Sequence, residues 1–263
     1  MRDGAAIAAT LGGRRAGKGW AFCCPCHADR TASCSIRDDG LVTCFAGCER
    51  REVYARLDEL GFPDDEKFVA VSAEDIAASE AQRITEARRM WDDAVYGGDH
   101  QTEYVAYYLK SRGVILPVPP VLRRWKRGFI ARLINLDGSV TAVHTKESYG
   151  KGLSWGVMKR GAVQLAPPRD GELGLAESIF DALSATQLTG VPCWAVCGAP
   201  RLDRIDLPDG VERVTIFSDN DEVGREAAQN ARREYRLQGC DVRIWPPPGD
   251  VKDWNDHLRG IKP

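Results

Sequence analysis

The sequence predicts an α/β protein with a small metal-binding module at its N-terminus. Six of its nine cysteines lie between residues 23 and 48, together with His27. From residue 171 onward, short apolar runs typical of strands alternate with helical stretches, which is the pattern of a parallel sheet. The length of 263 residues suits two domains, or one large domain with an appendage, and 43% hydrophobic residues are enough to bury a core.

The clustered cysteines are spaced as in tetrahedral zinc sites. One group, at residues 23–27, stands on a first turn, and Cys44 and Cys48 stand on a second, after a strand-like stretch. Two ligand pairs on two turns are the way in which a small fold holds a structural Zn²⁺ ion. The spacing leaves two sets of ligands open, either Cys24, His27, Cys44 and Cys48 or Cys23, Cys26, Cys44 and Cys48.

The order of the elements predicts three domains. Residues 1–62 form the metal module, in which two strands around an Asp-Gly turn precede a helix with apolar residues at helical spacing. Residues 73–165 are expected to form two helices and a hairpin, an α+β subdomain. Residues 166–263 form the parallel-sheet domain. The strands expected there are residues 173–176, 192–196, 211–217 and 242–245.

Charge is zoned along the chain although the net charge is only −2. Residues 110–160 carry eleven basic and two acidic side chains, a net +9, whereas residues 161–263 carry a net −5. Such a local excess predicts a face that meets a polyanion, although a run such as residues 123–127 also suits a plain solvated face. Trp125 would stack on a base. The residues expected to bind nucleic acid or nucleotides are Arg30, Arg37, Arg124, Trp125, Lys126, Arg127, Lys146, Lys151, Lys159 and Arg160.

Carboxylates follow three strands of the predicted parallel sheet. Glu177 comes directly after the first strand, and Asp219 and Asp221 come after the third. Because ligands of open α/β sheets bind at the carboxyl ends of the strands, these side chains should share one edge and hold Mg²⁺ or Mn²⁺. Asp253 and Asp256, after the fourth strand, would complete this site or bind a second ion. Asp221 and Glu177 also suit helix N-termini, as a cap and as a partner of the helix dipole.

Nothing in the sequence indicates a membrane or an export route. It has no run of 18 apolar residues, and its first residues lack the apolar core of a signal peptide. We therefore expect a cytoplasmic protein without a membrane partner, whose cysteines stay reduced and bind metal instead of forming disulfides.

The metal module resembles the zinc ribbon of DnaG-type bacterial primases. The family form is C-P-x-H, then T-P-S-x-x-V, then C-F-x-C-G, and the matching segments here are residues 24–27, 31–33 and 44–48. The C-P-x-H form favours Cys24 and His27 over the alternative thiols. The match departs from the family at Ala32, which replaces a proline, and in the three residues that separate Cys44 from Cys48.

The C-terminal part resembles the TOPRIM fold, which primases share with topoisomerases and some nucleases. Glu177, the Asp219/Asp221 pair and Lys252-Asp253 match its three signatures, and Gly224 completes a primase-like D-x-D-x-x-G form. Ser178 replaces the glycine that normally follows the motif glutamate. Residues 108–159 resemble the middle part of phage and mobile-element primases, so the resemblance covers nearly the whole chain.

The resemblance implies a DNA primase that makes short RNA primers on single-stranded DNA by metal-dependent nucleotidyl transfer from nucleoside triphosphates. The implied catalytic residues are Glu177, Asp219, Asp221 and Asp253, with Glu177 as a metal ligand or a general base. The implied cofactors are one structural Zn²⁺ and catalytic Mg²⁺ or Mn²⁺. Because the sequence stops at Pro263, it resembles a mobile-element form without the helicase-binding domain, for which a replicative helicase partner would be separately encoded.

Two other functions fit the same residues. A TOPRIM nuclease would use the same carboxylates to cleave DNA, and a zinc-ribbon DNA-binding protein would carry an inactive TOPRIM part. The intact set of Glu177, Asp219 and Asp221 argues against the second of these. A topoisomerase is disfavoured because no strand-passage region or separate tyrosine-bearing domain follows.

Overall fold

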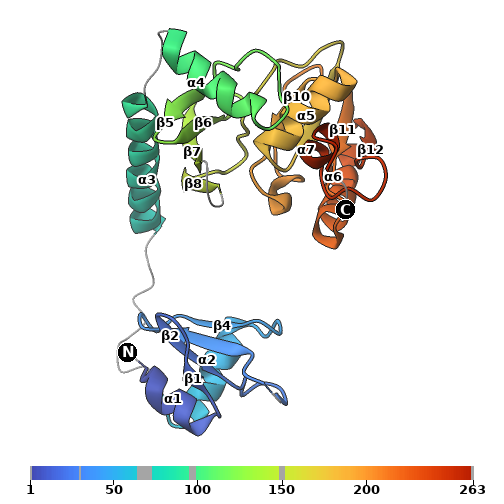
Figure 1. Ribbon diagram of the computed structural model, residues 1–263. Helices are drawn as coiled ribbons and strands as arrows, with labels where there is room; N and C mark the ends of the chain where they lie inside the picture. The colour runs from blue at the N-terminus through green and yellow to red at the C-terminus, as the bar shows by residue number, and fades with distance from the viewer. Residues whose placement is uncertain (1, 30, 64–72, 95–98, 148–151, 262–263) are drawn as a thin grey trace. The chain divides into compact units, whose positions relative to one another are not determined.

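The chain folds into two units. The structure, a computed structural model, describes residues 2–29, 31–63, 73–94, 99–147 and 152–261. Its backbone contacts separate Met1–Ser72 from Ala73–Pro263, and each unit is described by itself (Figure 1). The sequence also predicts a linker at residues 62–72, most of which lies outside the described residues.

The first unit is a four-stranded antiparallel sheet packed against two short helices. Helix α1 (Gly4–Thr10) begins at Asp3, whose carboxylate caps it by accepting hydrogen bonds from the amides of Ala5 and Ala6. Helix α2 (Arg50–Glu59) follows the sheet. The strands, in spatial order, are β1 (Arg14–Arg15), β2 (Gly19–Phe22), β3 (Cys34–Arg37) and β4 (Val42–Cys44). The fully buried core consists of Ile7, Phe22, Ile36, Val42, Val53 and Leu57.

The second unit begins with an antiparallel sheet between two helices, α3 (Ala73–Asp93) and α4 (Asp99–Lys110). The strands, in spatial order, are β5 (Leu122–Trp125), β6 (Gly128–Ile134), β7 (Val140–Glu147) and β8 (Leu153–Gly156). Alternate residues of β6 face opposite helices, as the pleat of a strand requires. Ile130 packs with Trp91 of α3, whereas Phe129 and Leu133 pack with Leu109 of α4.

The C-terminal half is a parallel sheet with helices on both faces. Its strands, in spatial order, are β10 (Cys193–Ala195), β9 (Glu172–Ala176), β11 (Arg213–Phe217) and β12 (Asp241–Ile244). Helices α5 (Ile179–Thr189) and α7 (Trp254–Leu258) pack on one face, and α6 (Glu222–Leu237) packs on the other. A short 3-10 turn, η1 (Ala199–Arg201), follows β10. The predicted α/β class with a C-terminal parallel sheet is therefore confirmed.

The antiparallel sheet and the parallel sheet share one hydrophobic core. Val105 of α4 and Phe129 of β6 belong to the same buried cluster as Phe180 and Leu183 of α5. The rings of Phe129 and Phe180 meet edge to face, with centroids 5.8 Å apart. The domain boundary expected between residues 165 and 166 therefore lies inside this unit, where a single core crosses it.

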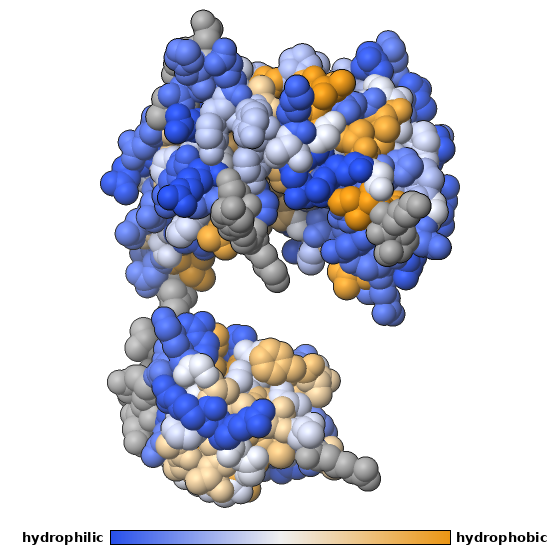
Figure 2. Space-filling model, viewed as in Figure 1, coloured by the Kyte–Doolittle hydropathy of each residue, from blue (hydrophilic) through white to orange (hydrophobic). Residues whose placement is uncertain are grey.

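The surface of the second unit is mostly hydrophilic in the view of Figure 2, with apolar patches over the part that carries the parallel sheet. Among the described residues, no helix is both long enough and apolar enough to cross a bilayer.

We predict that Trp254→Ala destabilises the second unit by about 3–5 kcal/mol, because Trp254 is 2% exposed and its loss leaves a cavity. Its ring packs edge to face on Phe217 at 5.1 Å and on Trp245 at 5.8 Å. Urea unfolding measures the change, and Leu237→Ala, at a side chain that is 82% exposed, should stay within about 0.5 kcal/mol. A loss under about 1 kcal/mol for Trp254→Ala would contradict this account of the core.

Candidate functional site

The first unit brings the two ligand pairs of the sequence motif, one Cys/His pair and one Cys/Cys pair, to one point. One ligand atom from each of Cys24, His27, Cys44 and Cys48 lies within 4.8 Å of the others. Nδ1 of His27 is 3.1 Å from Sγ of Cys48, which is 3.9 Å from Sγ of Cys24. Three thiols and one imidazole at this separation fit tetrahedral zinc. Within the described residues this group includes neither Cys23 nor Cys26, so the geometry agrees with the C-P-x-H alternative.

A carboxylate that the sequence analysis did not single out lies behind this group. Asp29 contacts Nε2 of His27 at 2.6 Å and accepts hydrogen bonds from the amide of Cys24 at 2.6 Å and the hydroxyl of Ser33 at 2.5 Å. These partners, led by the Cys24 amide, lower the pKa of Asp29 to about 2. The carboxylate therefore stays ionised and directs Nδ1 of His27 toward the thiols, as in other metal sites with a histidine.

The second unit gathers carboxylates at the carboxyl end of its parallel sheet. Ala176 and Phe217 are paired residues at the ends of β9 and β11, so Glu177 and Asp219 leave neighbouring strands side by side. Asp221 caps α6 by accepting a hydrogen bond from the Gly224 amide at 2.8 Å. The structural role considered for Asp221 is therefore present, and it fixes the carboxylate at this edge.

Helix α7 brings the last acidic segment to the same edge. Asp253 is the N-cap of α7 and accepts a hydrogen bond from the Asp256 amide at 2.7 Å. Asp253 acts electrostatically on both Glu177 and Asp219. Asp256 forms an ion pair with Arg259 at 3.9 Å. The structure therefore brings Glu177, Asp219, Asp221 and Asp253 together, as expected, and leaves Asp256 with a cationic partner of its own.

Burial and mutual repulsion make this edge a place that favours cations. Burial raises the pKa of Asp219 to about 8, with further contributions from Asp181, Glu177, Asp253 and Asp221 in that order. Burial also raises the pKa of Glu177, and Asp221 and Asp253 add to the shift. One buried oxygen of Asp219, Oδ1, has no hydrogen-bond partner among the described residues. Hard oxygen donors that repel one another, with one of them unpartnered, fit a divalent cation such as Mg²⁺.

Asp181 is a member of this group that the sequence analysis missed. It lies in the first turn of α5 and is 4% exposed, and it accepts hydrogen bonds from the Ser178 hydroxyl at 2.5 Å and the Asn255 amide at 3.0 Å. Burial raises its pKa, and Asp253 adds to the shift. The available signal was a single acid four residues after Glu177, within an otherwise apolar helical segment.

A cavity of about 380 Å³ opens beside Glu177. It lies between the two sheets of the second unit and is lined by Arg112, Phe129, His144, Lys146, Gly152, Glu177, Ser178, Ile179, Phe180, Cys197 and Gly198. Arg112 and Lys146 supply positive charge to the lining, and Glu177 supplies negative charge. Burial, and then Lys146, lower the pKa of His144 to about 4, so its imidazole is neutral at pH 7.

Lys146 was predicted to bind the nucleotide, and the structure places it in this cavity. Burial, and then the charge of Arg112, lower its pKa. The two cations therefore act on each other, an arrangement that an anionic ligand would relieve.

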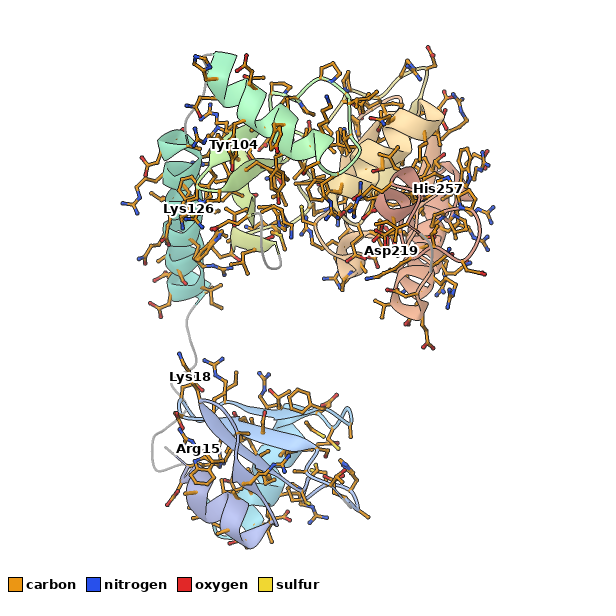
Figure 3. The ribbon with its side chains drawn as sticks, in the orientation of Figure 1. Arg15, Lys18, Tyr104, Lys126, Asp219 and His257 are labelled. Atoms are coloured by element: carbon orange, nitrogen blue, oxygen red, sulfur yellow. The ribbon has the colours of Figure 1, made fainter. Side chains whose placement is uncertain are left out.

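Other residues predicted to bind nucleic acid or nucleotides have acidic or aromatic partners within the protein. Lys159 pairs with Glu80 at 2.9 Å, Arg37 with Asp39 at 2.7 Å, Lys126 with Glu147 at 3.8 Å, and Arg160 with Asp206. Arg124 stacks on Tyr104 and donates to Gln101, Trp125 is half-buried beside Lys126, and Arg127 is exposed. Figure 3 shows Lys126 and Asp219 in separate parts of the second unit. Arg30 and Lys151 lie outside the described residues. Nucleic-acid binding by these residues stays a prediction.

The carboxylate edge coincides with a known domain family. Residues 172–261 match the family described as the Toprim domain. These residues are a Toprim domain. The match includes β9, β11 and α7, which carry Glu177, Asp219 and Asp253, so the TOPRIM fold expected from the signatures is confirmed.

Several known proteins are similar to the chain that carries this Toprim domain. An uncharacterized protein of Mycoplasma pneumoniae is 26% identical over 134 residues, which cover 50% of this chain and 61% of that protein. The Aquifex aeolicus primase structure, with its zinc-binding and RNA polymerase domains, is 14% identical, with a TM-score of 0.45 over 98% of this chain and 79% of that one. The primase fragment of the bacteriophage T7 primase-helicase protein is 15% identical, with a TM-score of 0.44 over 89% and 93%.

We predict that the protein without bound Mg²⁺ or Mn²⁺ loses stability as the pH rises from 3.8 toward about 8. The first value is the ordinary pKa of Asp219, and the second is its pKa in the folded protein. In this window the folded protein retains the Asp219 proton and the unfolded chain has released it, so rising pH favours unfolding. Urea unfolding at several pH values measures the slope. Asp219→Asn should flatten it, and saturating Mg²⁺ should oppose it. A metal-free protein that becomes more stable across this window would contradict the prediction.

We also predict that Cys48→Ser abolishes binding of one Zn²⁺ ion and unfolds the first unit, because bound zinc contributes about 10–16 kcal/mol to such small modules. Cys34→Ser is the matched control, since Cys34 is a buried neighbour of Cys24 and Cys44 outside the group of four. Metal content by mass spectrometry and circular dichroism report the two effects. Equal zinc content in Cys48→Ser and the native protein would reject the ligand set.

Proposed function

We propose that the protein is a DNA primase, an enzyme that joins nucleoside triphosphates into short RNA primers on a single-stranded DNA template. The observation that carries the proposal is the cavity that is lined by Arg112, Lys146 and the Toprim residue Glu177. Such a site has cations for a triphosphate beside one carboxylate of the acidic edge at which metal ions would bind. The primase-like motifs of the metal module and of the Toprim domain support the same activity.

The carboxylates and the cations would divide the work of nucleotidyl transfer. Glu177, Asp219, Asp221 and Asp253 would hold Mg²⁺ or Mn²⁺, which when bound neutralises phosphate charge and acidifies the attacking hydroxyl. Arg112 and Lys146 would bind the triphosphate oxygens and orient the α-phosphorus toward the 3′-hydroxyl of the growing primer. The hydroxyl oxygen forms the new bond to phosphorus, and pyrophosphate leaves.

Glu177 has a position that none of the other carboxylates shares, because it belongs to the acidic edge and also lines the cavity. Its raised pKa makes it a better proton acceptor than an exposed glutamate when it is ionised. It would either contact a metal ion or accept the proton of the 3′-hydroxyl.

The metal module would present the template. With Cys24, His27, Cys44 and Cys48 all bound to Zn²⁺, the ion has no open position, so its role is structural. Phe45, between two of these ligands, is 76% exposed and offers a ring on which a base can stack. Single-stranded DNA and nucleoside triphosphates are thus the proposed partners, and a replicative helicase is a further one.

We predict that Asp219→Ala abolishes primer synthesis, to below about 1% of the native rate, because it removes a central carboxylate of the metal site. The assay measures incorporation of labelled nucleotides on single-stranded DNA with Mg²⁺ or Mn²⁺. Asp241→Ala is the matched control, since Asp241 starts β12 at the opposite end of the same sheet and should leave the rate unchanged.

The same assay separates the rival functions. Degradation of the DNA with Mg²⁺ and without triphosphates would favour a nuclease. DNA binding without synthesis or cleavage would favour a non-catalytic zinc-ribbon protein. Full primer synthesis by Asp219→Ala would reject the assignment of the carboxylates.

A further inference from the structure

A buried amide connects the cavity to the Toprim domain. Asn255, the second residue of α7, is 1% exposed. Its side-chain oxygen Oδ1 accepts a hydrogen bond from Nε of Arg112 at 3.1 Å. Its nitrogen Nδ2 donates to the carbonyl oxygen of Arg112 at 2.8 Å and to the hydroxyl of Ser184 at 3.0 Å. The backbone amide of Asn255 donates to Asp181 at 3.0 Å.

The orientation of this amide follows from its partners. Nε of Arg112 can only donate and a carbonyl oxygen can only accept, so Oδ1 must face the guanidinium and Nδ2 must face the backbone of Arg112. Both ends of the amide are therefore used on a single residue. Neither leucine nor alanine could make these hydrogen bonds. Because Asn255 is deeply buried, a shorter side chain there would leave the polar groups of its partners unpaired.

Arg112 is held by two further contacts. Its guanidinium lies over the ring of Phe180, 4.8 Å from the centroid. The turn that follows is tied to α5, because Gln187 donates to the carbonyl of Gly113 at 3.0 Å and accepts from the amide of Ile115 at 2.7 Å. The backbone and the inner part of the Arg112 side chain are thus fixed by α5 and α7 of the Toprim domain.

The outer part of Arg112 remains available to a ligand. In the described part of the chain, no carboxylate forms an ion pair with Arg112, and neither terminal guanidinium nitrogen has a hydrogen-bond partner. Arg112 lines the cavity, as Glu177 does. An arginine fixed at Nε and stacked on a ring presents its terminal nitrogens in one direction, which lowers the entropy lost when it binds an oxyanion.

We propose that Asn255 is a positioning residue that holds Arg112 at the cavity wall, so that the guanidinium binds the triphosphate of the incoming nucleotide. The inference rests on the proposed function and adds to it a residue that does not itself touch the nucleotide. Helix α7 carries Asp253 at its cap and Asn255 in its first turn. One helix terminus therefore positions both an acidic group of the metal site and a cation of the cavity wall.

The test is a double-mutant cycle on nucleotide affinity. Asn255→Ala and Arg112→Ala should each weaken binding of ATP with Mg²⁺, measured by calorimetry, by about 10- to 100-fold, the scale of a charge-assisted hydrogen bond. If Asn255 acts through Arg112, adding Asn255→Ala to Arg112→Ala should change the affinity less than about twofold. In primer synthesis, Asn255→Ala should raise KM for the nucleotide more than it lowers kcat.

Two further variants separate positioning from folding. Ser184→Ala removes another partner of the same amide and should lower stability without changing ATP affinity. Asn255→Asp keeps an acceptor for Nε of Arg112 but loses both Nδ2 donations and adds a negative charge beside the guanidinium, so stability should fall while affinity falls less than in Arg112→Ala. Asn255→Asp also decides the matter if Asn255→Ala does not fold.

The outcomes are distinguishable. If the native protein binds neither ATP nor inorganic tripolyphosphate, the proposed function and this inference both fail. If the native protein binds ATP but the cycle is additive, or if Asn255→Asp loses as much affinity as Arg112→Ala, only the inference fails.

Discussion

The C-terminal half of the molecule depends on one electrostatic constraint, the repulsion among carboxylates at the end of a parallel sheet. Asp219 is half-buried there with Asp181, Glu177, Asp253 and Asp221 around it, and its pKa rises to about 8. A folded chain retains such a group only because the surrounding core determines the positions of its members. β9, β11 and α7 fix these positions through backbone pairing, helix caps and the Phe217–Trp245–Trp254 cluster. A divalent cation would convert this repulsion into attraction, so that structure and chemistry use the same residues.

The sequence predicted the local elements better than their partnerships. The helices and strands predicted from a clear hydrophobic period were correct. The helix cap at Asp221 was also predicted, because a carboxylate directly before a helix commonly caps it. β5 and β8 were not predicted. β5 has the basic sequence LRRW, whose arginines pack on aromatic rings. β8, at LSWG, is an exposed edge strand, so neither has the alternation of a half-buried strand.

In the candidate site, too, the residues with a local sequence pattern were predicted and those that act through long-range contacts were not. Ligand spacing identified the Cys/His group, and strand ends identified Glu177, Asp219 and Asp253, because both signals are local in sequence. Asp181, Asn255 and Arg112 act through contacts up to 143 residues apart, and no pattern in one sequence reports such distances. The net charge of the basic segment predicted a face that meets a polyanion, and three of its members form ion pairs with Glu80, Glu147 and Asp206. Total charge therefore overstates what is available to a polyanion.

The core shared by the two sheets restricts how this protein can vary. Phe129 and Phe180 come from segments that look like separate modules, yet each supplies half of one aromatic contact. Exchange of either module for that of a distant relative would therefore have to bring both halves of the contact together. Substitutions that preserve activity should accordingly arise as matched pairs across the two sheets, so that the cavity between them is inherited as a whole.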